Sequence, residues 1–315
     1  MATECEIYDI AQGNISDLTS TSRDTLILII SPVHGFNYPK ITLDFINNLP
    51  RGTNPVVLMN TRGAIKIGSF VTPGLSGIAF MLSSLIIKSK GYKIVGQVPF
   101  DMPSNWLSIH PSLNEKTVKY IHGVNNSRAE KHAHKIFSGH GDFLAYRDLI
   151  QDILIAPVAL GYYLIGRFAL AKSFYASADC YSCGNCIEKC PVKAIKTVKE
   201  HPFWTFKCES CMKCMNNCPK RAIESAHGLF ASAGILSSIV FTFIINSALQ
   251  FFIKSSSIRI ALWSIIFIAI TWFLYRIQHL LLRRKFFLKI IPFTSLTHYK
   301  FWGRYKSIPD TKWKE

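Results

Sequence analysis

Eight regularly spaced cysteines are the residues of this sequence best suited to chemistry. They lie in two stretches, residues 180–195 and 208–223, which match each other at an offset of 28 residues. Each stretch reads C-x2-C-x2-C-x3-C-P and continues with Ala-Ile three residues after the proline. Thiolates are soft ligands that bind zinc or iron–sulfur clusters, so the repeat predicts two metal centres.

The spacing separates these two possibilities. Structural zinc sites commonly combine two CxxC pairs across a longer linker. Three cysteines at two-residue gaps, followed by Cys-Pro, are instead typical of [4Fe–4S] clusters. We therefore expect two [4Fe–4S] clusters, with four-cysteine zinc sites as the alternative. The ninth cysteine, Cys5, lies far from the repeat and is not expected to be a ligand.

The repeat resembles the bacterial two-cluster ferredoxins, in which the fourth cysteine of each run ligates the other cluster. The resemblance implies that the first cluster uses Cys180, Cys183, Cys186 and Cys218, and that the second uses Cys208, Cys211, Cys214 and Cys190. Pro191 and Pro219 would redirect the chain after the fourth ligands. Ile195 and Ile223 would shield the clusters from water. No residue arrangement suggests a catalytic site, so no catalytic residue is expected.

Two apolar segments follow the cysteines. Residues 229–253 contain no charge over 25 positions, which is enough for a transmembrane helix. After the loop 254–259, a second segment covers residues 260–275 and continues to Leu282. A buried helical hairpin of a soluble domain is the alternative. A third apolar run, residues 153–166, is only 14 residues long and contains Pro157, so we interpret it as a packing linker.

The net charge of +17 is concentrated near these segments. Residues 276–315 contain ten Lys or Arg residues but only two acidic residues. Basic flanks beside membrane helices indicate the cytoplasmic side, so we expect an inner-membrane protein whose cluster domain and C-terminus face the cytoplasm. No secretory signal is recognisable, which agrees with the reducing cytoplasm. Nucleic acid is not an expected partner, because no recognition motif accompanies the charge.

The first 148 residues alternate β-rich and helical runs, which predicts an α/β domain with a parallel sheet. Strands are expected at residues 5–10, 25–31, 55–60 and 93–98, and helices at 40–48 and 74–88. Ligands of such sheets bind beyond the carboxyl ends of the strands. The loops that begin at Ser31 and Asn60 are therefore candidate ligand loops.

The order of these parts is similar to the flavodoxin–ferredoxin fusion family, found mainly in anaerobic microbes. The segments GYYLIGRFALAKSFYASADC (161–180) and HPFWTFKCESC (201–211) carry the likeness. It implies a flavodoxin-like α/β domain at 1–148, an apolar linker helix at 149–175, an α+β two-cluster ferredoxin domain at 176–227, a transmembrane helical hairpin at 228–283 and a basic cytoplasmic tail at 284–315. It also implies an FMN site lined by Ser31, Pro32, Val33, His34, Gly35, Asn60, Thr61, Arg62 and Gly63. Asn105 and Trp106 would lie beside it, with packing in the protein core as the equal alternative for Trp106.

One departure from the family concerns the start of the chain. The first flavodoxin strand and its phosphate-binding loop are missing, and in the 2-1-3-4-5 order that strand is central. Three explanations stay open: the true start lies upstream, another element fills the gap, or the domain is a flavin-free remnant. The leading expectation is a membrane-anchored electron carrier with unknown redox partners. A flavin-dependent reductase and a redox or iron sensor are the alternatives.

Overall fold

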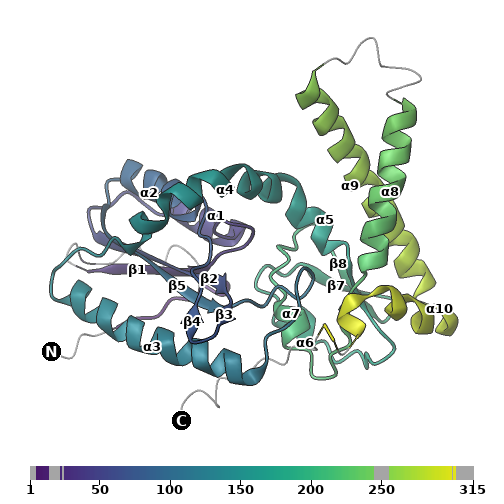
Figure 1. Cartoon of the computed structure of the whole chain (residues 1–315), viewed down its shortest axis with the longest axis horizontal. Helices are drawn as coiled ribbons and strands as arrows, with labels where there is room; N and C mark the ends of the chain where they lie inside the picture. Colours follow the sequence, from purple (N-terminus) through teal and green to yellow (C-terminus); the bar gives the residue numbers. More distant parts are fainter. Residues whose placement is uncertain (1–4, 14–21, 23–24, 245–254, 300, 303–315) are drawn as a thin grey trace. The chain divides into compact units, whose positions relative to one another are not determined.

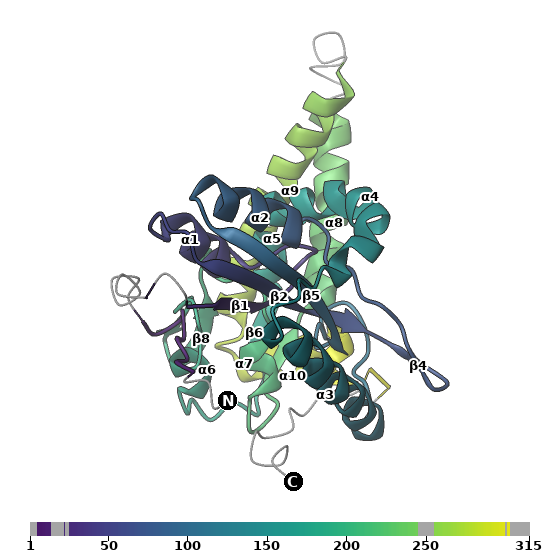
Figure 2. The ribbon, with the colours of Figure 1, turned by 90° about the vertical axis from the view of Figure 1, so that its left-hand side faces the viewer.

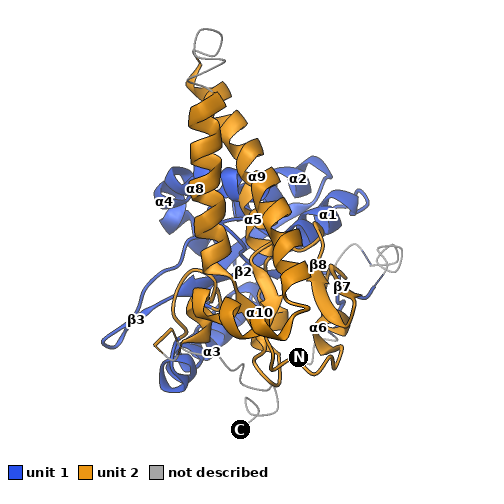
Figure 3. Cartoon of the chain, turned by 90° about the vertical axis from the view of Figure 1, so that its right-hand side faces the viewer, with its two compact units in different colours: residues 1–104, 113–163 blue, residues 105–112, 164–315 orange. Residues whose placement is uncertain are grey.

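A computed structural model describes residues 5–13, 22, 25–244, 255–299 and 301–302 (Figure 1). The chain divides into two compact units, which Figure 3 shows in different colours. The first consists of residues 1–104 and 113–163, and the second of residues 105–112 and 164–315. Each unit is described by itself.

The first unit is built on a parallel sheet of three strands. These are β1 (Ile27–Pro32), β2 (Pro55–Ala64) and β5 (Lys93–Pro103), in the order β1-β2-β5. A small antiparallel hairpin, β3 (Lys66–Ile67) with β4 (Phe70–Val71), follows β2. Three of the expected strands are thus confirmed. The strand expected at 5–10 is wrong: this stretch is irregular and ends in a turn, Ile7 is 90% exposed, and Tyr8 packs against Phe45 of a helix and not on the sheet.

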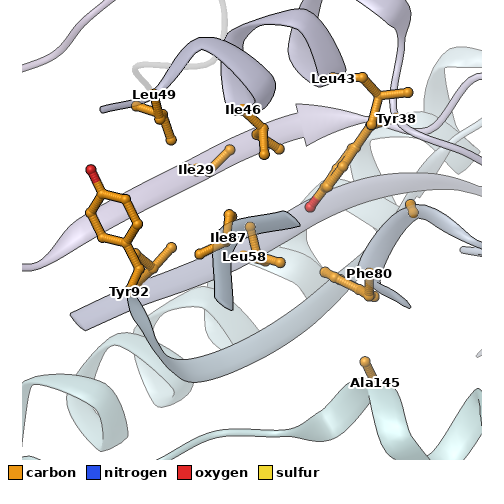
Figure 4. Packing of buried hydrophobic residues seen from close by; sticks show 12 residues of the cluster. Ile29, Tyr38, Leu43, Ile46, Leu49, Leu58, Phe80, Ile87, Tyr92 and Ala145 are labelled. Carbon is orange, nitrogen blue, oxygen red and sulfur yellow. The ribbon is translucent and has the colours of Figure 1, made fainter. Parts of the chain in front are cut away.

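Helices cover both faces of this sheet (Figure 2). On one face, α1 (Lys40–Asn48) and α2 (Ala79–Ser89) bury Leu43, Ile46 and Ile87 against Ile29 and Leu58 of the strands (Figure 4). On the other, Ile136 of α3 (Glu115–Phe137) packs on Val57 and Val98. Successive side chains of a strand point to opposite faces of the sheet, so Val57 and Leu58 pack into the hydrophobic cores on opposite faces.

The strand order bears on the resemblance to flavodoxin. β1 pairs directly with β2, with Ile27 opposite Val56, so the sheet has no gap where a first strand would be missing. Among the described strands the order follows the sequence without a reversal. A reversal is what opens the ligand crevice of the flavodoxin order. An α/β architecture is therefore present, while the flavodoxin order is not seen in the described strands.

A long helical run follows the α/β elements and passes from the first unit into the second. It comprises η2 (Leu144–Asp148), α4 (Leu149–Gly161), the π-turn η3 (Tyr162–Gly166) and α5 (Arg167–Ala171). The run is 28 residues long and is apolar enough to cross a membrane. The expectation that this segment is too short to span is wrong, because the helix continues on both sides of the 14-residue apolar core despite Pro157.

The second unit contains short strands, two single-turn helices and a helical hairpin. In chain order these are β6 (Phe174–Ala176), α6 (Asn185–Glu188), β7 (Ile195–Val198), β8 (His201–Trp204), α7 (Lys213–Asn216), β9 (Ile223–Ser225), α8 (His227–Ile244) and α9 (Ser256–Leu281). They are followed by α10 (Lys285–Ile290), η5 (Ile291–Thr294) and η6 (Leu296–His298).

The hairpin helices α8 and α9 lie side by side (Figures 1 and 2). Both are long and apolar enough to span a membrane. Small side chains meet at their interface: Ala233 and Ser237 of α8 and Thr271 of α9 are almost fully buried. Large apolar side chains such as Ile239 and Phe273 are exposed instead. The end of the first expected span at 245–253, the start of the loop at 254, and residues 300 and 303–315 of the basic tail lie outside the described residues.

Candidate iron–sulfur site

The two cysteine repeats fold in the same way. The helices α6 and α7 are offset by 28 residues, like the motifs that contain them, and Asn185 Nδ2 of α6 donates a hydrogen bond to the Asn217 carbonyl, 3.1 Å away. The strands are exchanged between the halves: β6, before the first motif, pairs with β9, after the second, and β7 pairs with β8. The repeats therefore form one module with an internal pseudo-twofold arrangement.

Left-handed backbone conformations recur at equivalent positions. Ser182 and Ser210 have φ of 57° and 53°, and Gly184 and Met212 have φ of 76° and 59°. Non-glycine residues adopt this region rarely, so its repetition inside both C-x2-C turns indicates a shape imposed by the motif. These turns let the chain fold back on itself between successive thiols.

Backbone N–H groups point at several sulfurs as a result. The N–H of Ala194 donates to Cys190 Sγ over 3.2 Å, and the N–H of Ala222 donates to Cys218 Sγ over 3.3 Å. The Ser210 N–H makes a similar contact of 3.4 Å with Cys208 Sγ. Such donors stabilise thiolate charge, and hydrogen bonds to cluster sulfurs tune the reduction potential.

The thiols gather in two groups. Burial and the nearby thiols of Cys180, Cys218 and Cys183 together raise the pKa of Cys186 to about 11. Burial also raises the pKa of Cys180, with Cys218 and Cys183 acting in the same direction. Cys218, from the second repeat, thus lies among the first three cysteines of the first repeat.

The second group has the reciprocal composition. Burial raises the pKa of Cys208 to about 12, with Cys211 and Cys190 adding to the rise. The pKa of Cys214 is raised well above its usual range by burial and by Cys211 and Cys208, and Cys186 of the first group also contributes. The two groups are therefore adjacent.

The thiols of neither group converge on a single metal position. Among the described residues, which include all eight motif cysteines, no three His, Cys, Asp or Glu side chains are placed to hold a single metal ion. A four-iron cluster does not need such convergence, since each of its thiolates binds a different iron atom. The residues present fit two clusters by their thiolate donors, their N–H contacts and their apolar surroundings.

Apolar side chains enclose the thiols. Ile195 and Ile223, expected to shield the clusters, are each 4% exposed and belong to one core with Cys208, Met212 and Met215. The core also contains the fully buried Trp204, whose indole lowers the pKa of Cys214 although its Nε1 has no partner at ordinary hydrogen-bond geometry. Apolar side chains thus bury Cys208, while Cys183 is exposed and the other six motif cysteines are partly exposed.

Three residues near the thiols were not found from the sequence. Trp204 and Lys172 are buried beside Cys208, and the backbone N–H of Trp204 donates to Tyr275 Oη of α9 over 2.8 Å. The phenol of Tyr275 is only 1% exposed and its ring lies 5.0 Å from that of Phe203. The sequence gives a signal only for Lys172, which is the one charged residue in the largely apolar stretch FALAKSFYA.

The segment 105–112 also belongs to the cluster unit. Leu107 is buried in the same core, Trp106 packs against it, and Ser108 Oγ lies 3.4 Å from Met212 Sδ. Trp302, near the end of the described chain, contacts this segment, because its Nε1–H donates a hydrogen bond of 2.7 Å to the Leu107 carbonyl. The expectation that Asn105 and Trp106 flank a flavin is therefore corrected: they cover the iron–sulfur module.

The loops expected to hold FMN do come together at the carboxyl ends of β1 and β2, where Ser31 is opposite Asn60 and Pro32 is opposite Thr61. Some of their polar groups are engaged within the chain, whereas the buried side-chain amide of Asn60 and Nδ1 of His34 have no hydrogen-bond partner among the described residues. Ser31 Oγ lies 2.7 Å from Thr42 Oγ1, and Arg62 is buried in ion pairs of 2.7 Å with both Asp101 and Asp148.

The remaining residues of these loops give the same result. A Cβ on Gly35 would lie 2.0 Å from the ring of Tyr162, so that ring occupies the space beside the loop. Val33 N–H donates to the Thr61 carbonyl, which links the two loops directly. Burial lowers the pKa of His34 to about 4, so this side chain is neutral at pH 7. Gly63 packs against Ser104. These residues do not fit FMN in the arrangement described.

Comparisons with known proteins agree with the cysteine geometry. No curated protein and no solved structure matches the chain. Residues 179–223 match the family described as "4Fe-4S dicluster domain". This stretch contains both motifs and the strands β7 and β8, and it ends at the first residue of β9. The chain therefore contains a ferredoxin-type 4Fe–4S dicluster domain at residues 179–223.

Proposed function

We propose that this protein is an electron-transfer protein held at a membrane by the hairpin α8–α9. The observation that carries the proposal is the folded repeat, in which two groups of thiols lie side by side in one apolar core. Bound there, [4Fe–4S] clusters supply one-electron redox chemistry. The chain provides the ligands, directs N–H groups to the sulfurs and packs apolar side chains beside them.

The ligand sets are part of the proposal. Three cysteines of each repeat bind one cluster, and the fourth cysteine comes from the other repeat. The thiol groups around Cys186 and around Cys208 support this assignment. Thiols must lose their protons to bind iron, so the raised thiol pKa values mean that cluster assembly releases protons.

Membrane anchoring is supported by the exposed apolar surface of the hairpin. Its two helices have mean hydropathies of 1.7 and 2.0 over the best windows, and few of these residues are buried by the protein itself. Basic residues follow α9 at Arg283, Arg284 and Lys285. By the positive-inside rule, the cluster module faces the cytoplasm.

The test is anaerobic purification in detergent, with iron, acid-labile sulfide, zinc and flavin measured on one sample. Two clusters require about eight irons and eight sulfides per chain. Cys186→Ser should lower the iron content and change the EPR spectrum of the reduced protein. Cys5→Ser is the matched control, since Cys5 is an exposed thiol outside the motifs. Zinc in place of iron, or an unchanged EPR spectrum in Cys186→Ser, would contradict the assignment.

FMN and the flavodoxin relationship stay predictions from the family resemblance. FMN binding would require the Tyr162 ring to leave Gly35. The flavin assay on the same sample tests this, and flavin at one per chain would favour a flavin–ferredoxin relay. Donor and acceptor proteins are proposed as partners without further identification.

A further inference from the structure

Lys172 is a lysine buried inside the iron–sulfur module. It follows α5 directly and is 2% exposed. Its ammonium group donates a hydrogen bond to the Trp204 carbonyl. Three aromatic rings surround it, with Nζ 4.4 Å from the ring centre of Phe206, 4.8 Å from that of Tyr275 and 5.3 Å from that of Phe203. The side chain is therefore held in one place rather than extended to solvent.

Burial of this charge needs a compensating anion. Lys172 forms no ion pair with a carboxylate in the part of the chain that the structure describes. Aromatic faces and one carbonyl stabilise an ammonium group only in part. These contacts are those of an ammonium group, because Nζ donates to the Trp204 carbonyl and lies over three aromatic rings.

The neighbouring anion is the second group of thiols. Trp204, whose carbonyl accepts the hydrogen bond of Lys172, lies in the same core as Cys208, and Phe206, which contacts the ammonium, is two residues before that cysteine. Cysteines that ligate iron are deprotonated, so a cluster at Cys208 would place negative charge beside the lysine. Each added electron would strengthen this attraction.

The first group of thiols lacks such a cation at the equivalent position. Adding the repeat offset of 28 to 172 gives Glu200, which is exposed and has the opposite charge. Its carbonyl accepts a hydrogen bond of 2.8 Å from Ser182 Oγ, and its side chain faces solvent. The two halves of the module thus share their backbone plan but differ in buried charge.

We propose that Lys172 raises the reduction potential of the second cluster above that of the first. The inference rests on the proposed function, since it requires both clusters. Charge, hydrogen bonding and solvent exposure set cluster potentials, and a buried cation favours the reduced, more negative state. The second cluster is then the first to be reduced when electrons are limiting. Lys172 acts through its fixed position and is not itself a redox group.

The experiment is an anaerobic redox titration of the full-length protein in detergent at pH 7, followed by EPR. Lys172→Met keeps the length and apolar stem but removes the charge, and Lys172→Arg keeps the charge. Lys207→Met is the matched control: it removes an exposed lysine adjacent to Cys208, where solvent screens the charge. Iron and sulfide are measured on every sample first.

Two one-electron waves are expected for the unaltered protein. Lys172→Met should shift the midpoint potential of the more positive wave in the negative direction and reduce the difference between the two midpoint potentials. Lys172→Arg should largely preserve the potential of that wave. Lys207→Met should shift it less than Lys172→Met does. An unchanged positive wave in Lys172→Met at full iron content would overturn the inference. Absence of iron in the unaltered protein would instead refute the proposed function.

A second measurement does not depend on how Lys172→Met folds. Cys183→Ser disturbs the first cluster and Cys211→Ser the second, so each wave can be assigned to a cluster. The inference requires the more positive wave to change in Cys211→Ser and to persist in Cys183→Ser. The reverse assignment would show that the first cluster has the higher potential.

Discussion

Replacing Tyr275 by Phe isolates the hydrogen bond between α9 and the iron–sulfur module. The substitution keeps the ring, and with it the contacts to Phe203 and Lys172, but removes the oxygen that accepts the Trp204 N–H over 2.8 Å. Both residues are at most 1% exposed, so water cannot replace the lost acceptor without local opening. An orphaned buried donor costs about 1–3 kcal/mol.

This cost converts directly into a measurable opening equilibrium. At about 1.4 kcal/mol per tenfold change, it corresponds to about 5- to 150-fold more frequent opening around Trp204. Hydrogen exchange of peptides covering residues 201–207 should speed up by that factor, because exchange follows the open population. Tyr299→Phe is the control, since the Tyr299 hydroxyl bonds the Phe293 carbonyl at an exposed site. Unchanged exchange in Tyr275→Phe at full iron content would refute the reasoning.

Three further predictions concern other parts of the chain. Ile223→Ala removes a side chain that is 4% exposed, should cost about 2–5 kcal/mol and should accelerate iron loss to a chelator, whereas the exposed Ile235→Ala should not. Arg62→Met leaves the buried Asp101 and the partly buried Asp148 without this partner, so hydrogen exchange should show that β2 and β5 lose about 3–5 kcal/mol of stability; unchanged protection of these strands would contradict the prediction. Burial raises the pKa of Asp142, but hydrogen bonds from His132 and Lys135 outweigh it and hold the pKa below 3.8. That stabilisation is present above pH 3.8 and lost as pH falls through the lower pKa, so Asp142→Asn should flatten the acid limb of thermal unfolding.

The metal-binding part of the site could be predicted because its information is local. The spacing of the cysteines within each repeat predicts the cluster type without knowledge of the surrounding fold. Lys172 and Tyr275 could not be found in this way. Tyr275 is 71 positions from its partner Trp204, and nothing in the sequence between them specifies that contact.

The fold was predictable where its signals were strong. The apolar runs of β1, β2 and β5 were identified, whereas α3 was not, because its surface is largely polar and only a few residues such as Val118, Ile121 and Ile136 are buried. Helix α2 begins at Ala79 and not at Gly74, because the Gly74 N–H donates to Asp101 and the Gly77 N–H donates to Asp152. Such tertiary partners are invisible in a local pattern.

The exchange of strands between the two cysteine repeats has a consequence for biosynthesis. Strand β6, made first, can complete its ladder only with β9, whose residues 223–225 are the last of the module to be synthesised. Neither half can fold independently as the chain emerges, because each half contributes a strand to the other. The nascent chain must therefore stay open, with its thiols accessible, until about fifty residues have left the ribosome. The first proposed ligand set is likewise complete only once Cys218 has been synthesised.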